Sequence, residues 1–324
     1  HLDLPKFGFR VNINLSADIA GIDRPEGSEA ETDSLVALTR KFSEGATLFH
    51  STRDKDTVRQ EVAAALQQFN EQFLLHSRSR REALLEHLDE GGLTEDEVPR
   101  DILTVLLANR ANQDLDDDMI LREVAFFMQA GSHSSANALT HSFHEINEWC
   151  RGHPEDRARL LTDDHFLQRS VHESLRLHPA SPVAWRTASE AFSLPDGTDV
   201  AEGDSVVIDL MSANLEAPLF GEDAEVFNPH RTVAARVPPF GLSFGIGIHT
   251  CFGRDIAGGL GDAKTKGEAP HLGTLTNLLK NLMQHDARPD PANPAVADAG
   301  TERPNWGSYP LMIGQRTTHA GAAI

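Results

Sequence analysis

A glycine-spaced loop that ends on a cysteine constrains this chain more than any other feature of its sequence. Residues 244–253 are Phe-Gly-Ile-Gly-Ile-His-Thr-Cys-Phe-Gly, and Cys251 is one of only two cysteines. Glycines let a backbone turn and approach a flat group without Cβ clashes. A thiolate is a strong donor to iron, and cysteine ligation of haem iron favours O–O bond cleavage. The pattern favours Cys251 as a donor in a binding site; an inert buried cysteine beside a glycine turn is the alternative.

The loop resembles the haem-binding loop of cytochrome P450, whose pattern is Phe-x-x-Gly-x-x-x-Cys-x-Gly. The four fixed positions are matched by Phe244, Gly247, Cys251 and Gly253. The resemblance implies a mainly α fold with a small β portion and a haem b cofactor (iron protoporphyrin IX). Cys251 would be the iron ligand, with Phe244, Gly245 and Gly253 against the cofactor. If Cys251 also begins a helix, free N–H groups there would hydrogen-bond the sulfur.

Periodicity and turn signals predict a mostly helical first half and a mixed second half. The predicted helices are 54–88, a capped start at 94–97, 101–107, a central buried helix at about 116–150, 154–161, 164–177 and 272–284. The predicted strands are 191–194, 205–210 and 309–313. A further helix after Cys251 is interrupted by Gly258-Gly259 and by a polar stretch to about Pro270. We expect residues 1–324 to form a single catalytic domain.

Glu173 and Arg176 are three residues apart, so on a helix they share one face and can pair. Such pairs are common on protein surfaces, where they contribute little stability. The resemblance implies more, because the family joins this pair to an arginine from a Phe-x-Pro-x-Arg segment, here Arg231. We therefore expect a buried three-residue network that fixes geometry rather than a catalytic site.

The segment Ala130-Gly-Ser-His-Ser134 lies in the middle of the predicted central helix. A mid-helix glycine costs about 1 kcal/mol, and a ligand or flat cofactor pressed against Gly131 would explain it. The family has an acid followed by threonine here, beside the cofactor, and uses the hydroxyl in proton delivery. His133 stands at the acid position and Ser134 at the threonine position, so both are candidate catalytic residues. Packing against a neighbouring helix is the alternative for each.

The resemblance also assigns binding positions around the cofactor and the substrate. His249 and Arg186 match positions that bind the haem propionates, and an arginine fork suits a carboxylate. Ala130 and Gly131 would contact the cofactor from the central helix. The substrate pocket would be lined by Phe126, Gln129, Val183 and Ala184.

Composition limits the partners and the compartment. The net charge of -20 argues against nucleic acid and anionic membranes as partners. Two cysteines make no disulfide framework, which favours a reducing, cytoplasmic location. The longest uncharged stretch, 124–144, contains too many polar residues for a membrane span.

These observations predict a haem-thiolate monooxygenase that activates O2 and oxygenates a small apolar organic substrate. No flavin or nicotinamide fingerprint occurs, so electrons from NAD(P)H would come through a separate ferredoxin or flavoprotein reductase. The resemblance covers about residues 100–320, and the family's N-terminal features are not found before residue 100. A peroxide-driven peroxygenase and a non-catalytic haem-binding homologue or sensor are the alternatives.

Overall fold

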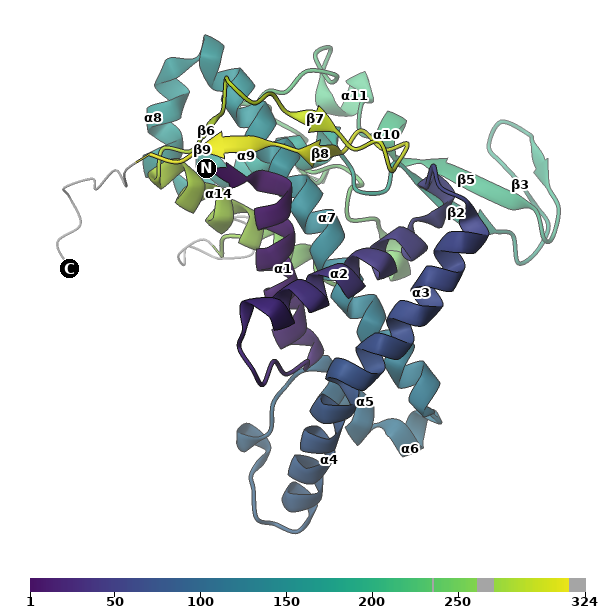
Figure 1. Ribbon diagram of the computed structural model, residues 1–324. Helices are drawn as coiled ribbons and strands as arrows, with labels where there is room; N and C mark the ends of the chain where they lie inside the picture. The colour runs from purple at the N-terminus through teal and green to yellow at the C-terminus, as the bar shows by residue number, and fades with distance from the viewer. Residues whose placement is uncertain (235, 261–270, 315–324) are drawn as a thin grey trace. The chain divides into compact units, whose positions relative to one another are not determined.

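In the computed structural model the described residues, 1–234, 236–260 and 271–314, form two compact units. The first unit contains His1–Asn137 and Pro289–Met312, and the second contains Ala138–Arg288 with Ile313 and Gly314. The long helix α7 (Asp117–Gly152) contributes to both units. Figure 1 shows the elements in chain order.

The first unit is mainly helical, with small sheets from both ends of its chain. Its helices are α1 (Leu4–Ala20), α2 (Glu29–Ala46), α3 (Lys55–Phe69), α4 (Leu75–Asp89), α5 (Ile102–Ala108), α6 (Arg110–Gln113) and the start of α7, with short 3-10 turns at Leu48–His50 and Glu95–Glu97. Its strands are β1 (Leu2–Asp3), β7 (Val296–Ala297), β8 (Trp306–Ser308) and β9 (Pro310–Met312). β1 pairs with β9 in antiparallel register, Leu2 opposite Leu311, and β7 pairs with β8. β6 (Arg288–Pro289) pairs with β9 on its other side.

Side-chain caps fix the helix ends in this unit. The Asp3 carboxylate accepts a hydrogen bond from the backbone N–H of Lys6, 3.2 Å away, and starts α1. Gly21 ends α1 with φ 83°, where a Cβ would lie 2.4 Å from the Asp101 carboxylate. Asp101 in turn caps α5 and accepts two hydrogen bonds from the Arg81 guanidinium. One buried carboxylate therefore connects α1, α4 and α5.

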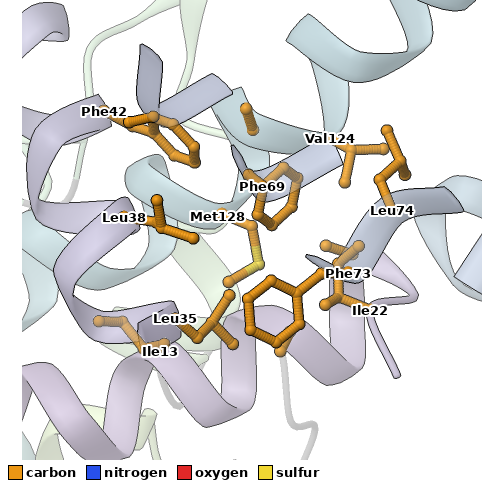
Figure 2. Close-up of a cluster of buried hydrophobic side chains, with 14 of the residues drawn as sticks. Ile13, Ile22, Leu35, Leu38, Phe42, Phe69, Phe73, Leu74, Val124 and Met128 are labelled. Carbon is orange, nitrogen blue, oxygen red and sulfur yellow. The ribbon is translucent and has the colours of Figure 1, made fainter. Parts of the chain in front are cut away.

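Aromatic and aliphatic side chains from α1, α2, α3 and α7 form the core of the first unit (Figure 2). Phe69 packs edge-to-face on Phe42, with ring centroids 5.4 Å apart. A π-helical turn, Asn70–Leu74, joins α3 to α4 without a break. The extra residue in this turn shifts the helix phase, so that Phe69, Phe73 and Leu74 are all buried. The predicted helix 54–88 is therefore continuous but changes its register at the π turn.

The second unit combines helices with short hairpins. Its helices are the rest of α7, α8 (Pro154–Thr162), α9 (Asp164–Leu177), α10 (Leu210–Ala213), α11 (Ala217–Phe220), α12 (Arg254–Gly258) and α14 (Thr274–Gln284), with a 3-10 turn at Gly247–His249. Its strands are β2 (Val183–Thr187), β3 (Phe192–Ser193), β4 (Asp199–Val200) and β5 (Ser205–Asp209). β2 pairs antiparallel with β5, Ala184 opposite Ile208, and β3 pairs with β4.

The predicted fold class, mainly α with a small β portion, is confirmed. α7 and α9 match the predicted helices closely, and β5 and β9 match two of the predicted strands. The strand β2 was not predicted; Pro182 stands directly before it, and proline commonly interrupts regular structure. The predicted interruption after Cys251 is confirmed at its edges, since α12 ends at Gly258 and α14 begins at Thr274. The polar stretch at 261–270 lies outside the described residues.

None of the helices in the described ranges combines the length and the apolar character needed to span a bilayer.

Candidate active site

The cysteine loop is closed by its own backbone. The N–H of Cys251 donates to the carbonyl oxygen of Phe244 at 2.7 Å, and the N–H of Gly245 donates to that of Leu242 at 2.8 Å. Gly245 has φ +65°, and a Cβ there would lie 3.1 Å from the carbonyl oxygen of His249. The turn therefore requires glycine at this position. Cys251 does not begin a helix, because α12 starts three residues later at Arg254.

The two cysteines differ in the way the loop motif predicts. Cys251 is exposed, whereas Cys150 is buried. Burial raises the pKa of the Cys150 thiol to about 11, so this thiol stays protonated and unreactive. The apolar side chains of Ile246, Ile248 and Phe252 around Cys251 are 67%, 96% and 90% exposed. An exposed thiol among uncovered apolar side chains fits a flat apolar group such as a porphyrin.

Two exposed nitrogen-bearing side chains of the same unit, His249 and Arg186, fit the charged edge of such a group. His249 follows the glycine turn two residues before Cys251, and Arg186 lies on β2 opposite Val206. The Arg186 guanidinium donates to the neighbouring carbonyl of Trp185 at 2.7 Å and forms no ion pair within the described ranges. Both residues are thus available for a carboxylate, as the propionate assignment requires.

Helix α9 contacts the segment before the cysteine loop and the end of α12 through His172. The His172 imidazole lies 2.7 Å from the carbonyl oxygen of Gly258, at the end of α12. Its ring packs edge-on against Phe240, and Phe240 packs edge-on against Phe244. A Cβ on Gly258 would lie 3.2 Å from the Phe244 ring. The motif phenylalanine is thus held between α9 and α12, and sequence reasoning missed His172 because its partners lie far along the chain.

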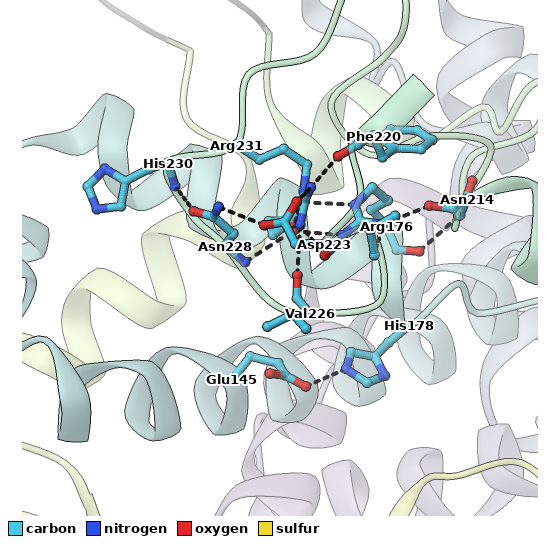
Figure 3. Close-up of polar contacts among 12 residues, drawn as sticks. Glu145, Arg176, His178, Asn214, Phe220, Asp223, Val226, Asn228, His230 and Arg231 are labelled. Atoms are coloured by element: carbon cyan, nitrogen blue, oxygen red, sulfur yellow. Dashed lines mark hydrogen bonds and ion pairs between the residues drawn. The ribbon is translucent and has the colours of Figure 1, made fainter. Parts of the chain in front are cut away.

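Glu173, Arg176 and Arg231 come together in one buried network. Figure 3 labels the two arginines of this network. The Glu173 carboxylate accepts hydrogen bonds from Arg176 at 2.8 and 2.7 Å and from Arg231 at 2.9 Å. Arg176 has no exposed surface and also donates to the carbonyl oxygens of Asn214 and Ala224, each at 2.7 Å. All partners of these three side chains are protein groups, and the network is shielded from solvent. It therefore holds α9 to the chain around 214–231, and a substrate has no access to it.

Asn214 extends the network to the cysteine loop and was not predicted. Its side-chain amide donates to the carbonyl oxygen of Arg176 at 2.9 Å and to the hydroxyl of Ser243 at 3.1 Å. Its side-chain oxygen accepts from the N–H of Leu242 at 2.7 Å. Asn214 is fully buried, and Gly241 approaches it so closely that a Cβ there would lie 2.2 Å from its oxygen. This one amide therefore connects α9 with the start of the loop.

The segment Ala130–Ser134 lies on the part of α7 that belongs to the first unit. A Cβ on Gly131 would lie 2.5 Å from the Ser16 hydroxyl of α1, so close helix packing explains this glycine without a cofactor. The Ser134 hydroxyl donates to the carbonyl oxygen of Ala130 at 2.9 Å. His133 is half-buried, and burial, followed by the charge of Arg303, lowers its pKa to about 4. The imidazole is therefore neutral near pH 7.

The predicted pocket-lining residues are divided between the units. Phe126 and Gln129 lie on α7 in the first unit, where Phe126 is 54% exposed and packs edge-on against Phe127. Val183 and Ala184 lie on β2 in the second unit and are half-buried. Each pair has surface available to a ligand, as pocket-lining residues require.

The fold and the site define a class of mainly helical proteins in which a closed glycine loop presents an exposed cysteine. A buried Glu-Arg-Arg network and a fully buried asparagine hold that loop in place.

Comparisons identify the family. The family model of cytochrome P450 matches residues 34–258, which is more than half of the chain, and the chain belongs to the cytochrome P450 family. Members of this family are haem monooxygenases. The likeness begins before residue 100, where sequence reasoning had found no family feature. It therefore includes helices of the first unit.

Individual relatives are distant and longer. Cytochrome P450 4F4 of Rattus norvegicus is 28% identical over 249 residues, which are 70% of this chain and 44% of that protein. The chain spans less than half the length of the curated relatives it matches. The structure of cytochrome P450 TbtJ1 matches with TM-score 0.67 and 18% identity over 97% of this chain and 71% of that one. CYP109E1 from Bacillus megaterium, solved in complex with corticosterone, matches with TM-score 0.66 and 18% identity over 96% and 72%.

Proposed function

We propose that this chain is the catalytic part of a haem-thiolate monooxygenase and that its two units act as one catalytic domain. Bound haem b would activate O2, so that one oxygen atom enters the substrate and the other leaves as water. The observation that carries the proposal is the exposed Cys251 thiol, held in a closed glycine loop by a buried ionic network.

The proposed roles of the chain's own residues come from the family resemblance, and several of their contacts support them. Cys251 supplies the iron ligand, Phe244, Gly245 and Gly253 shape the loop around it, and His249 and Arg186 bind the propionates. By the family resemblance, Ala130 and Gly131 would contact the cofactor from α7, and Gly131 also packs against Ser16 of α1. The Ser134 hydroxyl donates to Ala130 but keeps its acceptor lone pairs, so it can order a water that passes a proton. His133 is neutral near pH 7 and can relay a proton but carries none in reserve.

The proposed substrate is a small organic molecule, mainly apolar, that contacts Phe126, Gln129, Val183 and Ala184. The corticosterone complex of CYP109E1 supports a compact organic substrate. By the family resemblance, electrons would come from NAD(P)H through a separate ferredoxin or flavoprotein reductase. We place the reaction in the cytoplasm on the basis of cysteine usage.

Replacing Cys251 with Ala tests the proposal. The haem-loaded parent should give the thiolate-type spectrum of the carbon monoxide complex, and Cys251→Ala should lose it. Cys150→Ala is the matched control and should keep that spectrum, because Cys150 is buried in the second unit with a protonated thiol. A thiolate-type spectrum in Cys251→Ala would refute the ligand assignment. Turnover with peroxide alone, and none with a reductase, would make the protein a peroxygenase instead; no turnover in either case would make it a haem-binding homologue.

A further inference from the structure

Arg303 of the first unit is a shielded cation without a counter-charge. It lies in the chain between β7 and β8, is half-buried, and forms no ion pair in the described part of the chain. Its Nε atom is shielded from solvent and has no hydrogen-bond partner. Burial lowers the pKa of its guanidinium. A shielded charge of this kind costs free energy unless a partner binds it.

A second arginine, Arg40 of α2, is also a shielded cation without an ion-pair partner in the described ranges. Its guanidinium lies 4.5 Å from the centroid of the Phe9 ring and has no ion-pair partner among the described residues. Burial lowers its pKa, and the acids that oppose this shift are Asp298 and Asp3. Neither acid forms an ion pair with Arg40 among the described residues: Asp298 accepts from the N–H of Gly300 at 2.9 Å, and Asp3 accepts from Lys6 and from the Ser308 hydroxyl.

His133 lies in the electrostatic field of both arginines. Its ring packs edge-on against Phe9, with centroids 5.7 Å apart, and its Nε2 lies 3.2 Å from the amide nitrogen of Asn137. The charges that act on it are Arg303 and Arg40, which lower its pKa, and Asp298, which raises it. A neutral imidazole carries no negative charge, so His133 cannot compensate the positive charges of the two arginines. Two cations and one acid therefore act on the α7 position where the family pattern has an acid.

The segment that carries Arg303 is anchored to the connection between α2 and α3. The Thr52 hydroxyl donates to the carbonyl oxygen of Ala299 at 3.1 Å, and the N–H of Glu302 donates to that of His50 at 3.0 Å. Ser51 and Thr301 form an antiparallel bridge. Arg303 is thus presented from a tethered loop, and such anchoring lowers the cost of binding a ligand.

A shortage of acids does not explain the two unpaired arginines. The chain has 49 acidic and 29 basic residues, and most arginines of the first unit have a carboxylate partner. Arg303 and Arg40 are exceptions: Arg40 lies over the Phe9 ring, Phe9 packs against His133, and the charges of both arginines act on His133. Positions that keep a destabilising charge are characteristic of ligand sites.

We propose that Arg303 and Arg40 bind the carboxylate of an acidic organic substrate. This inference rests on the proposed function, because it narrows the substrate of that reaction to molecules with an apolar body and an anionic end. The guanidinium fork matches a carboxylate, and the Phe9 ring supplies apolar surface next to it. A bound carboxylate also favours the imidazolium form of His133, so substrate binding and proton uptake by His133 are linked.

Paired probes test this site directly in the haem-loaded protein. Octanoate is compared with 1-octanol, and 4-phenylbutyrate with 4-phenylbutanol, by isothermal titration calorimetry. The parent should bind at least one acid about ten- to a hundredfold more tightly than its alcohol, as a charge-assisted hydrogen bond provides. Arg303→Leu should lose this preference. Arg100→Leu is the matched control and should keep it, since Arg100 is an exposed arginine of the same unit paired with Asp96.

Stability separates a ligand site from a structural role. If Arg303 serves a ligand, Arg303→Leu should melt at the parent's temperature or higher, because it removes an unpaired shielded charge. Arg303→Gln, which keeps polarity without charge, serves if the leucine variant does not fold. Equal binding of acid and alcohol in both pairs, or an unchanged acid preference in Arg303→Leu or Arg303→Gln, would overturn the proposal. A haem-loaded parent that prefers acids but lacks the thiolate-type spectrum would refute the monooxygenase assignment and leave the anion site standing.

Discussion

Replacing Asn214 with Leu should separate helix α9 from the cysteine loop, because the Asn214 amide is a direct hydrogen-bonded link between them. The side chain donates to the Arg176 carbonyl and accepts from the Leu242 N–H. It also donates to the Ser243 hydroxyl, which donates to the carbonyl of Leu175 at 2.6 Å. Leucine has a similar volume, so the substitution removes hydrogen bonds without opening a large cavity.

The expected cost follows from the groups that lose their partner. The Leu242 N–H and the Arg176 carbonyl are left unsatisfied in a fully buried site, whereas Ser243 keeps Leu175. A buried group without a partner costs about 1–3 kcal/mol, so two groups cost roughly 2–6 kcal/mol of the free energy of unfolding. The bond from Arg176 to the backbone carbonyl of Asn214 remains, because the substitution does not change the backbone.

Urea unfolding of the apo-protein measures this cost, and the carbon monoxide spectrum of the haem-loaded variant reports the loop geometry. Asn214→Leu should lose stability and show a reduced thiolate-type signal. Asn281→Leu is the matched control: Asn281 is an exposed asparagine of the same unit that donates to a helix carbonyl, and its loss should change stability by less than about 0.5 kcal/mol. An Asn214→Leu variant as stable as this control, with an unchanged spectrum, would refute the link.

Two further predictions concern α7. His133→Gln should make the protein less acid-sensitive, because the imidazole pKa is lowered to about 4 by burial and Arg303. As the pH falls, the unfolded chain takes up that proton before the folded one does. The free energy of unfolding of the parent should therefore fall by roughly 2 kcal/mol between about pH 6.5 and about pH 5. An equal fall in parent and variant, measured by urea unfolding, would contradict this. Ser134→Ala should keep substrate binding but form more peroxide per electron consumed, and unchanged coupling would place the proton path elsewhere.

The sequence was most informative where function depends on a few neighbouring residues. The Phe244–Gly253 pattern needs ten consecutive positions, and the predicted central helix at about 116–150 follows from one long periodic stretch, which α7 confirms. Glu173 and Arg176 are one helical turn apart, so only the addition of Arg231 required the family pattern. Motifs and helices formed by residues close together in the sequence can be predicted without a structure.

The remaining features depend on contacts between distant segments. Asn214 meets Arg176 across 38 residues and Leu242 across 28, and no local signal marks it. The π turn at Asn70–Leu74 changes which helix face is buried, and that phase shift has no distinct sequence pattern. The helices before residue 100 are ordinary amphipathic segments, so their family membership emerged only from comparison.

Two arginines show how partners, rather than burial, separate structural from ligand-binding residues. Arg176 is fully buried, and its guanidinium bonds Glu173 and two backbone carbonyls, so Arg176→Leu should cost about 3–5 kcal/mol by leaving Glu173 short of partners. Arg303 is shielded at Nε but unpaired, so the same substitution there orphans no carboxylate. Arg176→Leu should therefore lower the melting temperature, whereas Arg303→Leu should leave it unchanged or raise it. Destabilisation by Arg303→Leu comparable to that by Arg176→Leu would mean that Arg303 holds the fold, and the carboxylate site would lose its physical basis.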